Sequence, residues 1–293
     1  MLATGEDQSP NGIFLASNES VYGPGERALE AISRSAGVVE RYPDDGTARL
    51  AAAIGARFSI NPETICCGFG SDDLLARLAR AYLSPGDELI YSAHGYPKIP
   101  NYAYANDAVP VSAADRDFTA DVDAILQCVT DRTRIVMLAN PDNPAGTYLS
   151  GGEVRRLHER LSPEILLVLD SAYTEYVSAP DYENPLALIK ASTNVVMTRT
   201  FSKVFGLAGL RVGWVCGPVE IIDTLKRIGI TFPISAPALA ACEATLQDRD
   251  HFEMVVGENH RIRSLFSDAL KSLGFEVIPS QTNFVLVRFA DSD

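Results

Sequence analysis

Histidine and cysteine are scarce in this chain of 293 residues, which has four histidines and five cysteines. The histidines are scattered without the spacing of metal ligands, so we expect no metal site. The cysteines are odd in number, and the only close pair, Cys66 and Cys67, is adjacent rather than arranged as C-x-x-C. We therefore predict reduced thiols and a cytoplasmic protein.

Long apolar runs are also lacking, and the 25 basic residues are outnumbered by 38 acidic ones. No apolar stretch approaches the roughly 20 residues that cross a bilayer. The first 14 residues have no basic region followed by an apolar one, so neither export nor membrane insertion is expected. The formal net charge is −13, and such a field repels nucleic-acid phosphates and anionic lipids. Any anionic ligand must therefore be captured by local groups.

Hydrophobic residues, at 46%, are plentiful enough to bury a substantial core. Between about residues 61 and 217, short apolar runs alternate with helix-like segments, which predicts βα units in a mostly parallel sheet. The seven expected strands are Ile65–Gly68, Glu88–Ser92, Val109–Ser112, Arg134–Asn140, Ile165–Asp170, Asn194–Arg199 and Arg211–Cys216. Runs such as ILLVLD are apolar on both faces, which is typical of a sheet covered by helices on each side.

After Pro218 the sequence becomes largely helical, with segments Val219–Ile228, Ala236–Leu246 and His251–Leu273. Two strand-like runs follow. We expect a large domain at 35–240 and a smaller α+β domain formed by 1–34 and 241–293. Two strands bury little surface alone, so the small domain is expected to be incomplete at its C-terminal end.

The segment TRTFSKVFGLAGLRVGW, residues 198–214, has the strongest chemical signal. Lys203 follows a predicted strand, and its amine could form an imine with an aldehyde and later move a proton between two carbons. Thr200 and Ser202 can donate hydrogen bonds to a phosphate, and Arg211 can bind it in a bidentate manner. A short S-x-K match alone usually marks only a surface lysine beside a turn.

The whole run resembles the Schiff-base segment of fold-type-I, pyridoxal-phosphate-dependent aminotransferases, and is most similar to the histidinol-phosphate aminotransferases. The resemblance extends from about Leu15 to Phe289, with the motifs in the family's order. It implies an α/β fold with a seven-stranded sheet, and pyridoxal 5′-phosphate carried by Lys203. It also implies transfer of an amino group between histidinol phosphate and 2-oxoglutarate in histidine biosynthesis.

Three further cofactor contacts are implied by this resemblance. Asp170, at the end of the run ILLVLD, would pair with the pyridine nitrogen, and Tyr173 would meet the phenolic oxygen. Asn143, in NPDNPAG, would contact the same oxygen, although Ala145 stands where the family usually has threonine. Taken alone, an aspartate after a strand often caps a helix, and a proline-rich run is usually a turn.

A glycine turn running into a helix can bind an anion through free backbone N–H groups. Here Gly70, Ser71 and Asp72 resemble the family's phosphate-binding turn of that kind. Tyr96 corresponds to the aromatic residue that stacks on the pyridine ring. Tyr42 resembles the tyrosine that reaches the phosphate of the neighbouring subunit's cofactor, which implies a homodimer.

The segment ASNESVYGP resembles a family segment at the substrate entrance, with Ser20 and Val21 where Asn-Pro is usual. Asn18 and Tyr22 are the candidate substrate contacts there. In the family the chain continues and supplies arginines for the anionic end of the substrate, and those positions have no counterpart here.

Several alternatives stay open. The same motifs serve aromatic amino-acid aminotransferases and threonine-phosphate decarboxylase. A shortened, catalytically idle protein that binds pyridoxal phosphate would also carry them. A purely structural or partner-binding role would leave the combination of Lys203, Asp170, Tyr173, Asn143 and Arg211 unexplained.

Overall fold

A computed structural model describes residues 15–43 and 47–289. Residues 1–14, where no export signal is expected, and residues 290–293 lie outside the described part. Both segments belong to the predicted small domain. The main sheet has seven strands in the order β1-β9-β8-β7-β6-β2-β3. Strand β9 is antiparallel to both neighbours, and the other pairs are parallel. The strands are β1 (Ile65–Gly68), β2 (Glu88–Ser92), β3 (Val109–Ala113), β6 (Thr133–Ala139), β7 (Leu166–Asp170), β8 (Val195–Thr200) and β9 (Gly213–Cys216). The mostly parallel sheet is confirmed.

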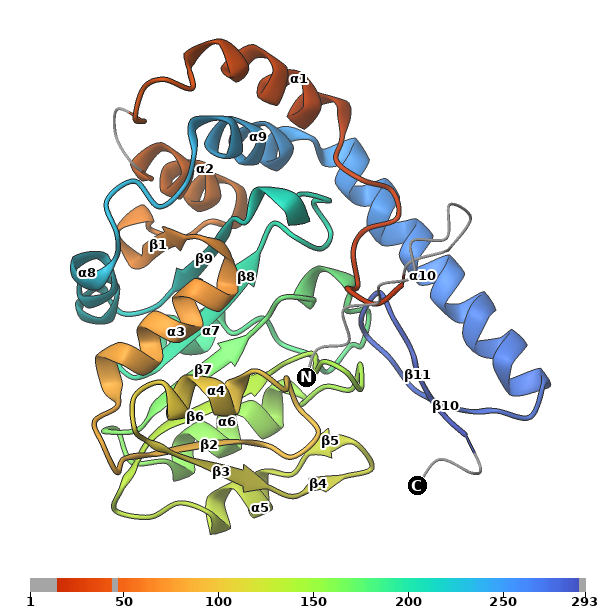
Figure 1. The fold of residues 1–293 in the computed structure, drawn as a ribbon. Coiled ribbons are helices and arrows are strands. Elements are labelled where there is room, and N and C mark those ends of the chain that lie inside the picture. The colour runs from red at the N-terminus through yellow and green to blue at the C-terminus, as the bar shows by residue number, and fades with distance from the viewer. Residues whose placement is uncertain (1–14, 44–46, 290–293) are drawn as a thin grey trace.

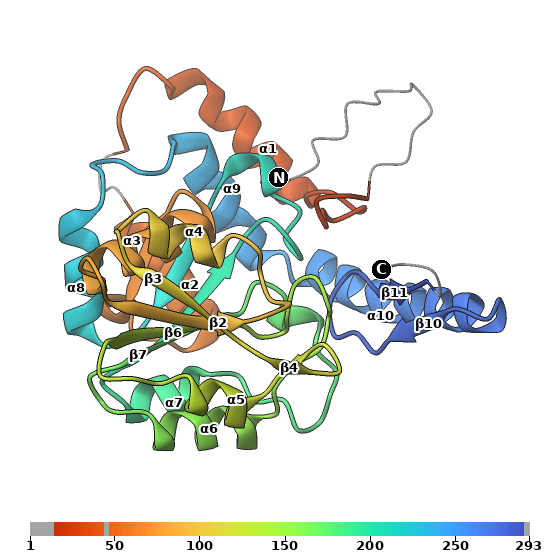
Figure 2. The same ribbon diagram turned by 60° about the horizontal axis from the view of Figure 1, so that its bottom comes forward.

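Both faces of this sheet are buried, as the doubly apolar runs predicted. Along β7, Leu166 and Val168 belong to one hydrophobic cluster, whereas Leu167 and Leu169 belong to the other. This alternation follows from the two-residue repeat of a strand. Figure 2 shows the covering layers. One face carries α3 (Gly70–Tyr82), α4 (Ile99–Tyr104) and α8 (Val219–Ile228), and the other carries α5 (Val122–Gln127), α6 (Gly151–Arg160) and α7 (Leu186–Ala191).

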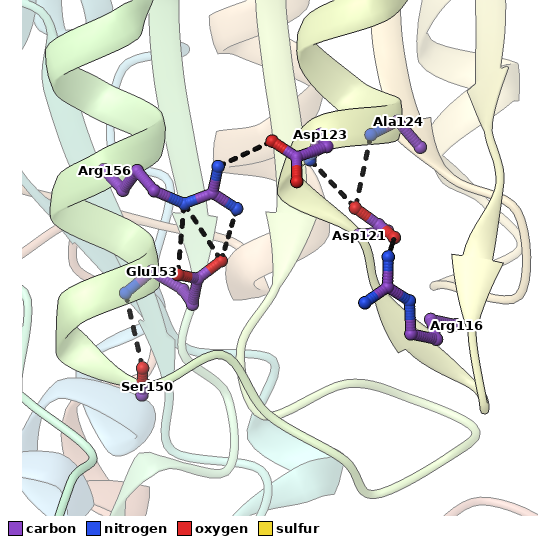
Figure 3. Close-up of polar contacts among 7 residues, drawn as sticks. All are labelled: Arg116, Asp121, Asp123, Ala124, Ser150, Glu153 and Arg156. Carbon is purple, nitrogen blue, oxygen red and sulfur yellow. Dashed lines mark hydrogen bonds and ion pairs between the residues drawn. The ribbon is translucent and has the colours of Figure 1, made fainter.

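Helices α5 and α6 begin at residues whose side chains cap free backbone N–H groups (Figure 3). Asp121 accepts hydrogen bonds from the backbone N–H groups of Asp123 and Ala124, and the Ser150 hydroxyl accepts one from the residue at the third position of α6. The Arg156 guanidinium lies 2.6 Å from the Asp123 carboxylate and thereby links the two helices. Such surface pairs add little stability, so the caps and the apolar faces determine this layer.

The remaining helices form a second group above and beside the sheet (Figure 1). Helix α1 (Glu26–Ser35) packs on α9 (Ala236–Gln247), which also contacts α2 (Ala48–Phe58). Helix α10 (Arg249–Ser272) extends away from the sheet, with the antiparallel strands β10 (Glu276–Ile278) and β11 (Leu286–Arg288) beside it.

Short elements complete the described chain. The 3₁₀ turns are η1 (Ala36–Val38), η2 (Pro62–Thr64), η3 (Thr174–Tyr176) and η4 (Ala208–Leu210). Strands β4 (Asp115–Arg116) and β5 (Thr119–Ala120) form a small hairpin. In residues 15–43 and 47–289, no helix combines the length and the apolar character needed to cross a membrane.

Six predicted strands match the observed ones to within one residue at either end, whereas the start of the seventh is wrong by two residues. The strand expected at Arg211–Cys216 begins only at Gly213. Arg211 instead ends η4 with a left-handed φ of +54°, and its guanidinium lies 3.3 Å from the Ser202 hydroxyl. The turn was not predicted because the run is mostly apolar. It directs the Arg211 side chain toward the segment that contains Lys203.

Candidate active site

The polar motifs converge at one edge of the sheet because the parallel strands β1, β2, β6, β7 and β8 all end there. At this edge lies a cavity of about 300 Å³, which is within the range of small-molecule sites. Of the residues singled out from the sequence, it is lined by Ser71, Asp72, Tyr96, Asn143, Asp170, Tyr173, Thr200, Ser202, Lys203 and Arg211. Residues that are far apart in the sequence thus line the same cavity.

Lys203 extends into the cavity, and its Nζ donates a 2.9 Å hydrogen bond to the backbone carbonyl of Ser17. The same nitrogen lies 5.5 Å from the centre of the Tyr173 ring. Burial lowers the pKa of Lys203, while the carboxylates of Glu19 and Asp170 oppose that shift. A lowered pKa increases the fraction of neutral amine, which is the form that attacks an aldehyde.

Asp170 ends β7 and is 7% exposed, with its carboxylate lining the cavity. Burial raises its pKa to about 6, although a 2.9 Å hydrogen bond from the Thr198 hydroxyl favours the charged form. The carboxylate is therefore ionised at neutral pH. A buried anion of this kind can hold a proton on a ring nitrogen that is placed against it.

We expect Asp170→Asn to stabilise the cofactor-free protein at pH 8. The folded carboxyl has a pKa of about 6 against an ordinary value of 3.8, so wild-type stability falls as pH rises through this interval, and the penalty is complete above it. Asparagine carries no such penalty and can still accept from Thr198. The gain should reach up to about 3 kcal/mol at pH 8 and vanish near pH 4, measured by urea unfolding. A variant less stable than wild type at pH 8 would contradict this account.

The Tyr173 hydroxyl is flanked by two amides. The Nδ2 atoms of Asn143 and Asn18 each lie 3.4 Å from it. Burial raises the pKa of Tyr173, so its hydroxyl stays protonated and can donate a hydrogen bond into the cavity. Asn143 and Tyr173 therefore form a pair of donors on one side of the chamber.

An anion-binding corner lies at the start of α3. Gly70 opens this helix with φ +82°, and a Cβ placed there would come within 2.6 Å of the Arg211 Nη2 atom. Glycine is therefore needed both for the backbone conformation and for the approach of the guanidinium. The hydroxyls of Ser71, Thr200 and Ser202 line the same cavity. Arginine, hydroxyls and a helix N-terminus together suit a phosphate.

Tyr96 also lines the cavity, and its hydroxyl donates a 3.1 Å hydrogen bond to the Asp72 carboxylate. Asp72 accepts a second bond, of 2.7 Å, from Tyr102 on α4. The sequence did not single out Tyr102, because a tyrosine in a short apolar helix has no distinctive pattern. The Asp72 side chain thus holds the Tyr96 ring, a role beyond the phosphate contact expected for it.

Some expected residues lie outside the cavity lining. Tyr42 is 76% exposed, and its ring stacks on Phe232 at 4.6 Å between ring centres. Tyr22 packs partly against the hydrophobic core, while Asn18 reaches the site only through Tyr173. Conversely, Ser17 and Glu19 line the cavity without having been predicted. Their only signal was their position beside Asn18 in the entrance segment.

This donor set matches pyridoxal phosphate group by group. Arg211 and the hydroxyls suit the phosphate, Asp170 the ring nitrogen, Asn143 and Tyr173 the phenolic oxygen, and Lys203 the aldehyde. The close approach of Arg211 over Gly70 forms a preorganised cradle for the phosphate end. Within the described ranges, no group of three or more histidine, cysteine or acidic side chains could hold a metal ion.

Comparison with known proteins agrees with this geometry. The family model described as aminotransferase class I and II matches residues 10–293. The chain belongs to this family. The sequence of this aminotransferase is 48% identical over 278 residues to a histidinol-phosphate aminotransferase of Rhodospirillum centenum, covering 95% of the chain and 77% of that protein. It is also 48% identical over 277 residues to the one of Paramagnetospirillum magneticum, covering 94% and 76%.

Solved structures give the same result. The aminotransferase is similar to the histidinol-phosphate aminotransferase of Sinorhizobium meliloti, solved with pyridoxal-5′-phosphate, with a TM-score of 0.88 and 31% identity, covering 92% of this chain and 74% of that one. An aspartate aminotransferase of Thermus thermophilus, solved with maleate, has a TM-score of 0.83 at 23% identity, with coverages of 93% and 76%. The second likeness concerns the fold alone.

Proposed function

We propose that this chain binds pyridoxal 5′-phosphate and acts as a histidinol-phosphate aminotransferase. The proposal rests above all on the convergence of Lys203, Asp170, Asn143, Tyr173 and Arg211 in one cavity. The relatives that share nearly half of its residues support the choice of substrate. The reaction converts histidinol phosphate and 2-oxoglutarate into imidazole-acetol phosphate and glutamate.

The side chains divide the chemistry between them. When bound, the cofactor supplies an electron-accepting ring that makes a proton on the substrate's α-carbon acidic. The Lys203 amine would hold the cofactor through its aldehyde and, when free, would move that proton. Asp170 would keep a proton on the ring nitrogen, and Tyr173 and Asn143 would donate hydrogen bonds to the phenolic oxygen. Arg211, Ser202 and Thr200 would hold the phosphate, and Tyr96 would contact the ring.

We also propose a homodimer in which Tyr42 serves the site of the neighbouring subunit. Its exposure and its stacking on Phe232 support this, because both aromatic rings lie away from their own cavity on the surface. The buried free thiols Cys66, Cys67, Cys216 and Cys242 support a reducing, cytoplasmic location.

The direct test is the visible absorbance of the purified protein after addition of pyridoxal phosphate, before and after addition of an amine. We expect a band that converts to the amino form of the cofactor with histidinol phosphate. Phenylalanine, the substrate of the aromatic alternative, should convert it more slowly. O-phosphothreonine should release no carbon dioxide, which a decarboxylase would release while leaving the cofactor as the aldehyde. A band that ignores histidinol phosphate and phenylalanine, with no carbon dioxide released, would indicate an idle cofactor-binding protein, and no band would refute the proposal.

A further inference from the structure

The loop of residues 280–284, the SQTNF loop, is held by hydrogen bonds on three sides. The Ser280 hydroxyl donates to the Phe284 carbonyl at 2.6 Å, and the Thr282 hydroxyl donates to the same carbonyl at 3.1 Å. Gln281 fixes the loop to the large domain: its backbone N–H donates to the Gly146 carbonyl, and its side-chain oxygen accepts from the backbone N–H of Ser178, both at 2.8 Å.

From the third side, Asn259 and Arg263 on α10 both donate to the Thr282 carbonyl, at 3.2 and 2.7 Å. The Phe284 ring meets the Tyr173 ring edge-on, with ring centres 5.2 Å apart. This small loop therefore combines many hydrogen bonds with direct contact to the active site.

The side chain of Asn283 extends from the SQTNF loop to residues 17–23. We call this segment the N-terminal strap. Its Nδ2 donates to the Asn18 carbonyl at 3.0 Å and to the Glu19 carbonyl at 3.4 Å. The strap has no helix or strand of its own. Its far end is held separately, because the Nε2 atom of His251 lies 3.2 Å from the Gly23 carbonyl.

The two residues fixed by Asn283 stand directly over the reacting groups. Asn18 has a left-handed φ of +52° and places its amide 3.4 Å from the Tyr173 hydroxyl. The adjacent Ser17 carbonyl accepts the 2.9 Å hydrogen bond from Lys203, and Glu19 lines the cavity. A displacement of the strap would thus remove a hydrogen-bond acceptor and a negative charge from the lysine together.

We propose that Asn283 is a positioning residue that holds the strap against the catalytic lysine and thereby sets the proton affinity of its amine. This rests on the proposed function only in calling Lys203 catalytic. The other charged groups near the amine are Asp170 from β7, Asp72 from α3 and Arg211 after η4. Among the described residues, none of these three groups forms a hydrogen bond with the strap, so they remain in place when the strap moves.

The test uses Asn283→Leu, which keeps the approximate size of the side chain and removes its donor without adding a charge near the amine. The cofactor-free protein is acylated with acetic anhydride across a pH series, and the labelling of Lys203 is followed by peptide mass spectrometry with exposed Lys271 as internal reference. Loss of one hydrogen bond to a charged amine should lower the labelling midpoint of Lys203 by about one pH unit. The sign is downward because the protonated form loses an acceptor and the nearby Glu19 charge.

Asn259→Leu is the matched control. Its amide also donates to a backbone carbonyl at the SQTNF loop, but that carbonyl keeps the bond from Arg263 and does not belong to the strap. The control midpoint should match wild type. An unchanged midpoint in Asn283→Leu, or an equal fall in both variants, would overturn the proposal.

Glu19→Gln keeps the test decisive if Asn283→Leu folds poorly, because the Glu19 carboxylate is exposed and forms no hydrogen bond with the described residues. Alone, this variant should lower the Lys203 midpoint. In combination with Asn283→Leu it should add little, because the displaced strap has already moved the Glu19 charge away from the amine. Full additivity would count against a held strap. The labelling requires no turnover, so failure of the aminotransferase assay would leave this result intact.

Discussion

Lys203→Ala is expected to abolish the visible band with pyridoxal phosphate and to lower turnover of histidinol phosphate by at least about 10⁴-fold. The reason is that one amine serves both as the point of covalent attachment and as the proton carrier. The fold should survive, since the Lys203 amine contributes a hydrogen bond only to Ser17. Absorbance spectra and glutamate-coupled kinetics provide the measurement.

Two variants control for charge and for general damage. Lys203→Arg retains the positive charge in the cavity but has no reactive amine, so it should be as inactive as the alanine variant. Lys226→Ala removes an amine that donates a 3.5 Å hydrogen bond to the Glu63 carbonyl far from the cavity lining, and this variant should behave as wild type. Turnover above a tenth of wild type in Lys203→Ala would refute the assigned role.

Glu175→Ala should destabilise the protein by about 3–5 kcal/mol, the largest stability effect that we expect. Glu175 lies in η3 and pairs with Arg199 on β8, and the two side chains are only 4% and 3% exposed. The guanidinium also lies 4.2 Å from the centre of the Phe58 ring and 5.1 Å from that of Trp214. Removal of the carboxylate would leave a buried cation without its counter-charge.

The losses of stability in Glu175→Ala and Glu30→Ala are compared by urea unfolding. Glu30 pairs with Arg34 on the surface, with side chains 66% and 75% exposed, so its loss should cost under about 1 kcal/mol. Replacing both buried partners, by Glu175→Leu with Arg199→Met, should recover much of the stability. A loss for Glu175→Ala no larger than that for Glu30→Ala would show that the pair is not electrostatically isolated.

Sequence patterns predicted the sheet well because each strand has a local cause. Apolar runs such as ILLVLD are buried on both faces, and the observed β7 differs from the predicted strand by one residue at its start. The motif residues Asp170, Asn143 and Lys203 could be named in advance from the resemblance of their segments to the aminotransferase family. Each lies at or after the end of a strand, and parallel strands bring their carboxyl ends to one edge. The turn at Arg211 was missed because its left-handed backbone depends on the returning guanidinium contact rather than on composition.

The sequence alone determined the α/β class, the residues of the cofactor motifs and the resemblance to aminotransferases, since these depend on local periodicity and short motifs. Only the tertiary structure decided that Tyr102 supports Asp72 and that Glu175 pairs with Arg199. It also decided that the strap contacts Lys203 and is itself bound by Asn283. Asn283 is 265 residues from Asn18 in the chain. Contacts across such separations arise from the packing of whole elements, and no local pattern in the sequence encodes them.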